Sequence, residues 1–136
     1  PIHVDVKPDN VLFNKGKLSG IIDFDNAHRG PLLLDLAKSM VWFGLGLKRF
    51  NVRRAVAVYR GYISERNLTA KEYGELYKVL RFAFASHLYV DYYMKATKKI
   101  PSSYFTFLMN DFYNSYISFS RFSERKFYAY LSQKND

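Results

Sequence analysis

The chain has 136 residues, of which 49% are hydrophobic and 18% aromatic, so it is long enough to form one domain with a buried core. It has no cysteine, which excludes disulfide and thiolate chemistry and is consistent with a cytoplasmic protein. No apolar run is long enough to span a bilayer, so we expect no membrane partner.

The formal net charge of +9 is compatible with nucleic-acid binding. However, Lys and Arg are spread along the chain in blocks no longer than Arg53-Arg54 or Lys98-Lys99, and the twelve Tyr and twelve Phe recur at helical spacings. This pattern favours core packing over base stacking. We therefore expect no nucleic-acid partner and keep that function as a minor alternative.

The first predicted element is a β-hairpin. Two short β-prone runs flank residues 14–17, whose glycine suits a tight turn. If this turn closes a regular hairpin, Asn10 lies opposite Ile21, and Asp23 becomes the diagonal neighbour of Asn10 on the same face. A slip of one residue would place the two side chains on opposite faces.

The polar residues around this hairpin have the spacing of a phosphoryl-transfer site. In such a site one residue orients the acceptor hydroxyl and takes its proton, while two others hold Mg²⁺ against the triphosphate of ATP. We predict Asp5, in a loop that Pro8 keeps out of regular pairing, as the catalytic residue. Asn10 and Asp23 are the predicted ligands of Mg²⁺ and, through it, of the nucleotide. Lys7 is a second catalytic candidate, because its cation could lie beside the transferred phosphoryl group.

Three short motifs carry a resemblance to a known family. The segment from His3-Val4-Asp5 through Asn10, then Ile22-Asp23-Phe24, then Asp35-Leu36-Ala37, resembles the C-terminal lobe of the aminoglycoside phosphotransferase, choline kinase and homoserine kinase superfamily. That superfamily shares the protein-kinase-like fold. The residues from Asn10 to Phe24 most resemble the homoserine-kinase-like branch.

The resemblance implies roles for individual residues. Asp5 would be the catalytic base, Asn10 and Asp23 the metal ligands, and Asp35 a structural anchor beneath the catalytic loop. Asp25 matches a position where some members carry a second acid, so it is a weaker metal-ligand candidate.

The resemblance also implies a fold and an activity. The fold would be mainly α with a small β-hairpin, with residues 1–136 forming the C-terminal, acceptor-binding lobe of a phosphotransferase domain. The activity would be ATP- and Mg²⁺-dependent transfer of a phosphoryl group to the hydroxyl of a homoserine-like, choline-like or sugar-alcohol acceptor. The chain contains no G-x-G-x-x-G loop. We therefore expect the N-terminal nucleotide lobe to lie outside it, and this fragment alone to be inactive; its oligomeric state cannot be read.

Two other functions stay open. A protein kinase is less favoured, because Phe24 is followed by Asp25 rather than Gly and too few residues lie between Asp25 and Asp35 for a peptide-docking segment. A non-catalytic remnant or interaction module of the same fold is the second alternative. Polycationic aminoglycosides are poor acceptor candidates, because few acidic residues follow Asp35.

Four helices are predicted after the hairpin. The first follows Pro31 and ends near Gly44; the second begins at the N-cap Asn51 and stops near Asn67. The third begins with a Thr69–Glu72 capping box and runs to about Lys98, and the last spans roughly 104–131. Acceptor contacts should come from polar residues on the third helix, although each is more often a rim or core residue; the candidates are His87, Tyr89, Asp91 and Tyr92.

Overall fold

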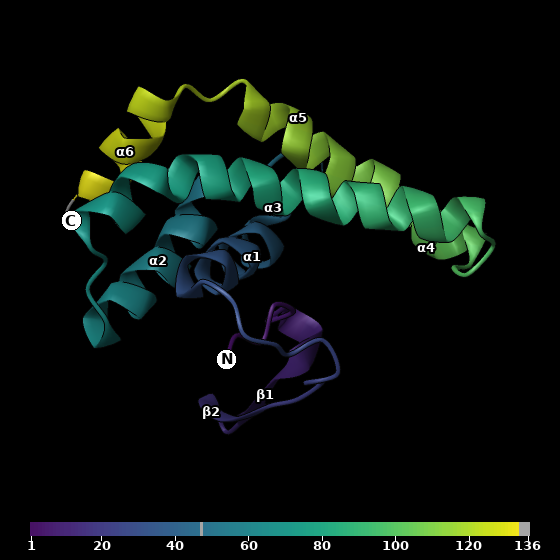
Figure 1. The fold of residues 1–136 in the computed structure, drawn as a ribbon, viewed down its shortest axis with the longest axis horizontal. Coiled ribbons are helices and arrows are strands. Elements are labelled where there is room, and N and C mark those ends of the chain that lie inside the picture. Colours follow the sequence, from purple (N-terminus) through teal and green to yellow (C-terminus); the bar gives the residue numbers. More distant parts are fainter. Residues whose placement is uncertain (47, 134–136) are drawn as a thin grey trace.

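The computed structural model describes residues 1–46 and 48–133. It is mainly helical with one two-stranded antiparallel sheet, as predicted, and the hairpin lies apart from the helices at the bottom of the view in Figure 1. The elements are η1 (Pro8–Asn10), β1 (Val11–Asn14), β2 (Lys17–Ile21), α1 (Leu32–Gly44), α2 (Val52–Glu65), α3 (Ala70–Ala96), α4 (Ser102–Phe107), the π-helical η2 (Leu108–Tyr113), α5 (Asn114–Ser120) and α6 (Glu124–Ser132).

The hairpin forms where predicted, but its register changes in the middle. Near the turn the strands pair as expected, whereas further along Ser19 is an extra residue in β2 and forms a β-bulge. As a result Ile22, rather than Ile21, lies opposite Asn10, and its N–H donates a 3.0 Å hydrogen bond to the Asn10 carbonyl. The predicted pairing of Asn10 with Ile21 was therefore wrong.

The predicted starts of α2 and α3 are confirmed by their caps. Asn51 Oδ1 accepts a hydrogen bond from the Arg54 N–H at 3.2 Å. At α3, Thr69 Oγ1 accepts from the Glu72 N–H at 3.2 Å, and the Glu72 carboxylate accepts from the Thr69 N–H at 2.9 Å. This reciprocal pair is the predicted capping box.

The last predicted helix is wrong as a single element. The chain forms α4, η2 and α5, breaks after Ser120, and then starts again as α6. Ser123 caps α6 by accepting a 3.2 Å hydrogen bond from the Lys126 N–H, and the Phe122 carbonyl accepts one from the Tyr77 hydroxyl at 2.5 Å. At the break, the Lys126 N–H and the Phe122 carbonyl therefore bond to side chains, whereas in a continuous helix they would bond to other backbone groups.

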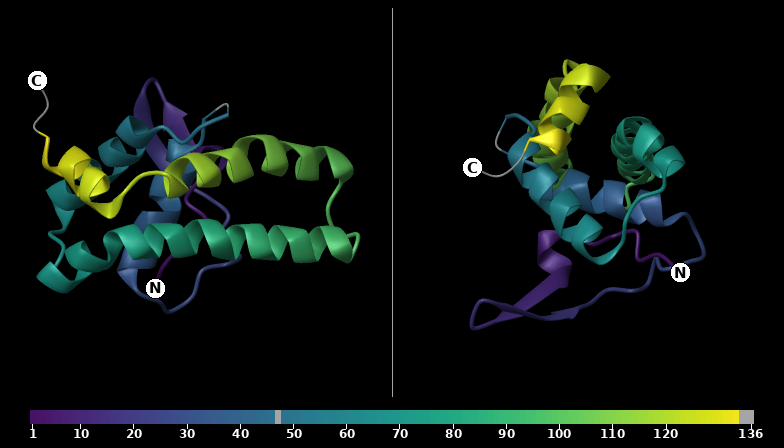
Figure 2. Two further views of the ribbon diagram at one scale, coloured as in Figure 1. Left: turned by 90° about the horizontal axis from the view of Figure 1, so that it is seen from above. Right: turned by 90° about the vertical axis from the view of Figure 1, so that its left-hand side faces the viewer.

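The core lies among the helices, with α1 packed against α2 and α3. From above, α3 lies alongside α4, η2 and α5 (Figure 2). Edge-to-face and tilted rings join these layers, and five of them are Phe50, Phe84, Phe112, Phe119 and Phe127. One side of α1 is buried in this core, namely Leu33, Leu36, Ala37, Met40 and Val41. Over residues 1–46 and 48–133, no helix has both the length and the hydropathy to cross a membrane.

Candidate active site

Asp35, in the first turn of α1, anchors the loop before the hairpin. Its two carboxylate oxygens accept hydrogen bonds from consecutive backbone N–H groups, that of His3 at 3.0 Å and that of Val4 at 2.7 Å. Val4 has a φ of 71°, which is strained for a β-branched residue. The bonds from Asp35 hold this conformation directly before Asp5, so the predicted anchoring role of Asp35 is confirmed.

His3 joins the loop to the end of the hairpin. Its buried ring accepts a 3.3 Å hydrogen bond from the Asp5 N–H at Nδ1, and its Nε2 lies 3.0 Å from the Ile22 carbonyl oxygen. A ring that accepts at Nδ1 and donates at Nε2 is the neutral tautomer protonated at Nε2. The ring of Phe24 packs against it with centroids 4.4 Å apart. His3 thus positions its loop.

Asn10 brings the three predicted site residues together. Its side chain is buried, with the residue 5% exposed, and its Nδ2 lies 2.9 Å from the Asp5 carbonyl oxygen. The same Nδ2 is 3.3 Å from Asp5 Oδ2 and 3.4 Å from Asp23 Oδ2. One amide therefore contacts both acids, which places Asp5, Asn10 and Asp23 at one point.

Asp23 reaches this point despite the shifted register. If β2 continued, the bulge would direct Asp23 to the face opposite Asn10. However, β2 ends at Ile21, and Asp23 has a φ of 68° in the left-handed region. Asp is one of the few side chains that adopt this conformation with modest strain, and here it turns the carboxylate back toward Asn10.

The donor set fits Mg²⁺. The hydrogen bonds of Asn10 to described residues use Nδ2, so its Oδ1 remains an oxygen ligand beside the exposed Asp23 carboxylate. No group of three or more His, Cys, Asp or Glu able to hold a metal is found within 1–46 and 48–133. Mg²⁺ commonly takes only one or two protein ligands and completes its shell with phosphate oxygens and water, so two oxygen donors suffice. Asp25 lies in the exposed turn from Phe24 to Ala27.

Lys7 is paired with the predicted base. Its Nζ lies 2.8 Å from Asp5 Oδ2, and it also lies 5.5 Å from the centroid of the Trp42 ring. Both side chains of the ion pair are partly exposed, so the pair can open toward solvent or a ligand. Lys7 therefore connects the loop to α1.

Beyond Trp42, two polar side chains of α3 face the same region. His87 packs against Trp42 with ring centroids 4.8 Å apart, and its Nε2 lies 3.0 Å from Asp91 Oδ2. Asp91 is buried, with the residue 6% exposed. Burial lowers the pKa of His87 to about 4, with nearby Lys38 adding to the effect, and burial raises the pKa of Asp91 to about 6.

The pKa values of two further residues, Lys38 and Tyr104, are affected by the Asp5 and Asp91 carboxylates. Burial lowers the pKa of Lys38 on α1, while the carboxylates of Asp5 and Asp91 oppose that shift. Burial raises the pKa of Tyr104 on α4 to about 12, and the same two carboxylates add to the shift. We call Lys38, Trp42, His87, Asp91 and Tyr104 the helical cluster.

The sequence prediction identified only part of the helical cluster. His87 and Asp91 were candidates, and the structure brings them together one helical turn apart. Tyr89 and Tyr92 point elsewhere, since Tyr89 is 74% exposed and the Tyr92 hydroxyl contacts the Met109 sulfur at 3.1 Å. Lys38 was missed, although it is the single cation within α1.

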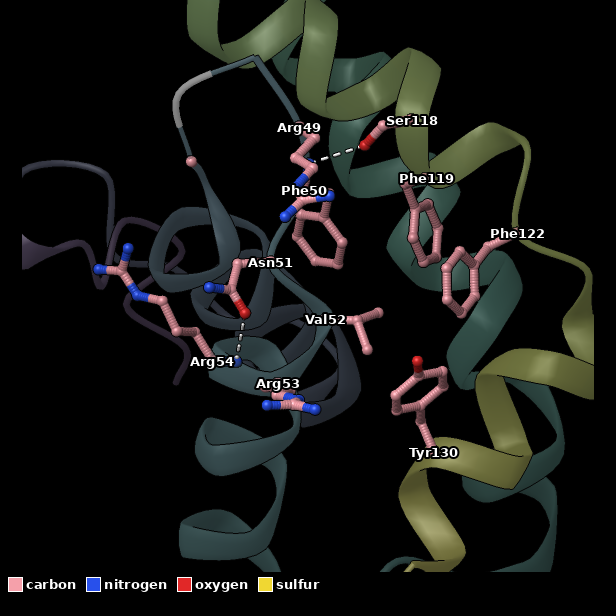
Figure 3. A pocket seen from close by; sticks show the side chains of 11 residues that line it. Arg49, Phe50, Asn51, Val52, Arg53, Arg54, Ser118, Phe119, Phe122 and Tyr130 are labelled. Atoms are coloured by element: carbon pink, nitrogen blue, oxygen red, sulfur yellow. Dashed lines mark hydrogen bonds between the residues drawn. The ribbon is translucent and has the colours of Figure 1, made fainter.

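A separate cavity of about 830 Å³ opens between the start of α2 and the helices α5 and α6 (Figure 3). Phe50, Phe119, Phe122 and Tyr130 contribute rings to its lining, and Arg49 and Arg53 contribute cations. Neither the three predicted site residues nor any member of the helical cluster lines it. The three predicted site residues therefore lie outside this cavity.

Comparison with known proteins identifies related sequences. The model of the phosphotransferase enzyme family matches residues 1–70, which include the loop, the hairpin and α1. A homoserine kinase of Sinorhizobium fredii is 35% identical over 92% of this chain and 40% of its own length. A homoserine kinase of Rhizobium meliloti is 37% identical over 77% of this chain and 35% of its own length.

A third relative, a homoserine kinase of Sinorhizobium medicae, is 42% identical over 52% of this chain and 22% of its own length. The chain thus spans less than half the length of each of these relatives. No solved structure matches it.

Proposed function

Because this chain belongs to the phosphotransferase enzyme family, we propose that the complete protein transfers the γ-phosphoryl group of ATP to the hydroxyl of a small molecule. The observation that carries this proposal is the convergence of Asp5 and Asp23 on the Asn10 amide. An acid that faces an acceptor hydroxyl beside a pair of oxygen ligands is the arrangement this chemistry requires.

In the proposed reaction the acceptor oxygen forms a bond to the γ-phosphorus as the bond to the ADP oxygen breaks. Asp5 orients the hydroxyl and accepts its proton, and Lys7 neutralises charge on the transferred group. Asn10 and Asp23 would hold Mg²⁺, which neutralises the charge of the phosphates. Asp35 and His3 act indirectly, because they fix the backbone on either side of Asp5.

We further propose that this chain is the C-terminal lobe of the enzyme and that the nucleotide-covering lobe belongs to the remainder of the complete protein. Two facts support this division. The chain matches only 40% of the length of its S. fredii relative, and its sequence has no G-x-G-x-x-G loop. Residues 1–136 alone should therefore not turn over ATP.

Homoserine is the first acceptor to test, since three relatives are named homoserine kinases. Choline and a sugar alcohol represent the other two acceptor classes that the motifs allow. The complete protein should be incubated with MgATP and each compound, with ADP release measured and the phosphorylated product identified by ³¹P NMR. A control with excess EDTA tests the requirement for Mg²⁺.

The expected result is ADP release that depends on both Mg²⁺ and one acceptor, with a phosphomonoester as product. A folded complete protein that phosphorylates none of the three classes would contradict the proposal. That outcome would favour the non-catalytic module.

A further inference from the structure

We propose that the cavity between the start of α2 and the helices α5 and α6 is a second binding site, which takes a small organic anion with an aromatic body. None of the predicted phosphoryl-transfer residues lines this cavity, so the inference goes beyond the proposed function. Two properties of the lining support it: cations without acidic neighbours on one side, and packed aromatic rings on the other.

The cavity has the size of a small-molecule site. Its volume of about 830 Å³ lies in the range of about 300–1,000 Å³ in which such ligands are bound. The Phe50 N–H donates a 2.7 Å hydrogen bond to Ser118 Oγ on α5, 68 residues further along the chain. This bond joins the two sides of the cavity, so its shape is part of the folded structure.

The aromatic part of the lining is already packed. The ring centroids of Phe50 and Phe119 lie 5.1 Å apart, and those of Phe122 and Tyr130 lie 5.5 Å apart. Phe50 and Phe119 are also buried, so the core holds their rings in place. Rings that are already ordered can pack against a ligand ring with little further loss of side-chain entropy. This part of the lining therefore favours a ligand with an aromatic body.

The opposite side of the cavity carries positive charge. Figure 3 shows Arg49 and Arg53 at the start of α2, with the rings of Phe119, Phe122 and Tyr130 on the side of α5 and α6. No Asp or Glu is among the described residues that line the cavity, and neither arginine belongs to an ion pair in the described part of the chain. Because a guanidinium binds carboxylate and similar groups through paired hydrogen bonds, this side favours an anionic group.

Arg54 also lines the cavity but has another contact. Its guanidinium points away from the rings in Figure 3, and its Nη1 donates a 3.3 Å hydrogen bond to the Leu45 carbonyl oxygen. Val52 and Arg53 lie in the first turn of α2, and the N-terminal end of a helix adds partial positive charge. Arg49 and Arg53 are therefore the expected partners of the anionic group.

The lining selects among ligand classes. A cation such as choline would meet two arginines and no carboxylate from the described lining. A sugar alcohol has neither the charge for the arginines nor the apolar surface for the four rings. An aromatic carboxylate, sulfonate or phosphate satisfies both parts of the lining.

Binding can be measured with 8-anilinonaphthalene-1-sulfonate, an aromatic anion whose fluorescence rises when it leaves water. We would titrate this probe into the complete protein, as wild type, Arg49→Met and Arg53→Met. Arg81→Met is the matched control, because Arg81 is exposed on α3 and does not line the cavity. Circular dichroism reports whether each variant folds. No ATP or acceptor is present, so the readout does not depend on phosphoryl transfer.

Three competitors of nearly equal size separate the effect of charge from that of the rings. They are the anion 2-naphthylacetate, the neutral 2-naphthylacetamide and the cation 2-(2-naphthyl)ethylamine, and each is used to displace the probe from the wild type. The anion should bind about 10-fold more tightly than the amide, the effect of one charge-assisted hydrogen bond, and the amine should bind most weakly.

The variants should change these affinities selectively. Arg49→Met and Arg53→Met should each weaken binding of the probe by about 10-fold, because each removes a charged hydrogen-bond donor. Both should also reduce the advantage of 2-naphthylacetate over 2-naphthylacetamide. Arg81→Met should change neither value.

A saturable signal that neither folded arginine variant weakens would overturn the inference, since the probe would then bind elsewhere. Equal displacement by the three naphthalene compounds would also overturn it. So would the absence of saturable binding to the folded wild type, because the cavity would then not be accessible in the complete protein. If one arginine variant does not fold, the other variant and the wild-type competition decide. The proposed phosphoryl transfer is measured separately and can stand or fail independently of these results.

Discussion

The Asp35 carboxylate accepts a 2.7 Å hydrogen bond from the Val4 N–H and so holds Val4 at a φ of 71°. A second bond from the His3 N–H, at 3.0 Å, uses the other carboxylate oxygen. Backbone strain of this kind costs about 1–3 kcal/mol and persists only where its surroundings enforce it. Asp35 therefore determines the direction in which the chain enters Asp5.

Replacing Asp35 should affect both stability and rate. Asp35→Ala leaves two backbone N–H groups without their acceptor, which costs about 1–3 kcal/mol each when such groups are buried. We expect a lower free energy of unfolding and a lower kcat, with a smaller change in KM, because Asp5 would lose its position while the acceptor groups remain. Urea unfolding and steady-state kinetics of the complete protein measure these effects. An unchanged kcat in a folded Asp35→Ala variant would contradict the anchoring role.

The Mg²⁺ requirement should depend on Asp23. Among the described residues, the Asn10 amide contacts two carboxylates, those of Asp5 and Asp23. Asp23→Asn removes the second of them. We expect the Mg²⁺ concentration for half-maximal activity to rise by about 10-fold or more. Mutation of even an outer-shell partner of a metal commonly lowers metal affinity by about that factor. Titration of Mg²⁺ at fixed ATP gives this value.

Asp25→Asn tests the weaker ligand candidate in the same titration. Its effect should be smaller, because Asp25 lies in an exposed turn. Asp9→Asn, an exposed acid in η1, is the control. A larger effect for Asp25→Asn than for Asp23→Asn would reverse the ligand assignment.

Acceptor recognition should depend on pH through Asp91, the buried acid among the predicted acceptor contacts. Burial raises its pKa to about 6, while the nearby cations of Lys38 and Lys7 oppose the shift. Below that pH Asp91 is protonated and neutral, so it loses its attraction for an ammonium group. We therefore expect kcat/KM for homoserine to fall as the pH decreases through about 6.

The other titratable groups that face this region behave differently. His87 has a pKa of about 4 and Tyr104 one of about 12, so neither changes charge near pH 6. The comparison acceptor is 4-hydroxybutyrate, which has no ammonium group and should not show the Asp91-dependent decrease. The same decrease with both acceptors, or in Asp91→Asn, would assign it to another group.

Local patterns in the sequence predicted much of the fold. The caps at Asn51 and Thr69 are hydrogen bonds between residues three positions apart, so a short stretch of sequence is enough to predict them. Ser123 carries the same N-cap signal, followed by the acidic Glu124, so the start of α6 also has a local sequence sign.

The grouping of the three candidate site residues was predictable from the sequence, but the geometry that produces it was not. The spacing of Asp5, Asn10 and Asp23 predicts a phosphoryl-transfer site, whereas their convergence depends on a bulge at Ser19 and a positive φ at Asp23. These two deviations from a regular hairpin compensate each other. Neither is visible as a pattern, because Ser and Asp are ordinary residues in a turn-rich segment.

The contact between the catalytic loop and the helices could not be predicted either. Lys38 and Asp91 are far apart in the chain, and only the packing of α1 against α3 brings them near Asp5. Residues that come together only in the folded chain form no local sequence motif, so their spacing does not predict their contact. For Lys38, the available sign was that it is the single cation in α1.

The most direct test of the phosphoryl-transfer site is kcat of the complete protein with the acceptor it phosphorylates, compared with that of Asp5→Asn. Asparagine keeps the shape of the side chain but cannot accept the proton, and Asp9→Asn in η1, directly after this loop, is the matched control. We predict that Asp5→Asn lowers kcat by about 100-fold or more while folding normally, whereas Asp9→Asn has little effect. An Asp5→Asn variant with the kcat of the wild type would contradict the assignment of Asp5 as the base.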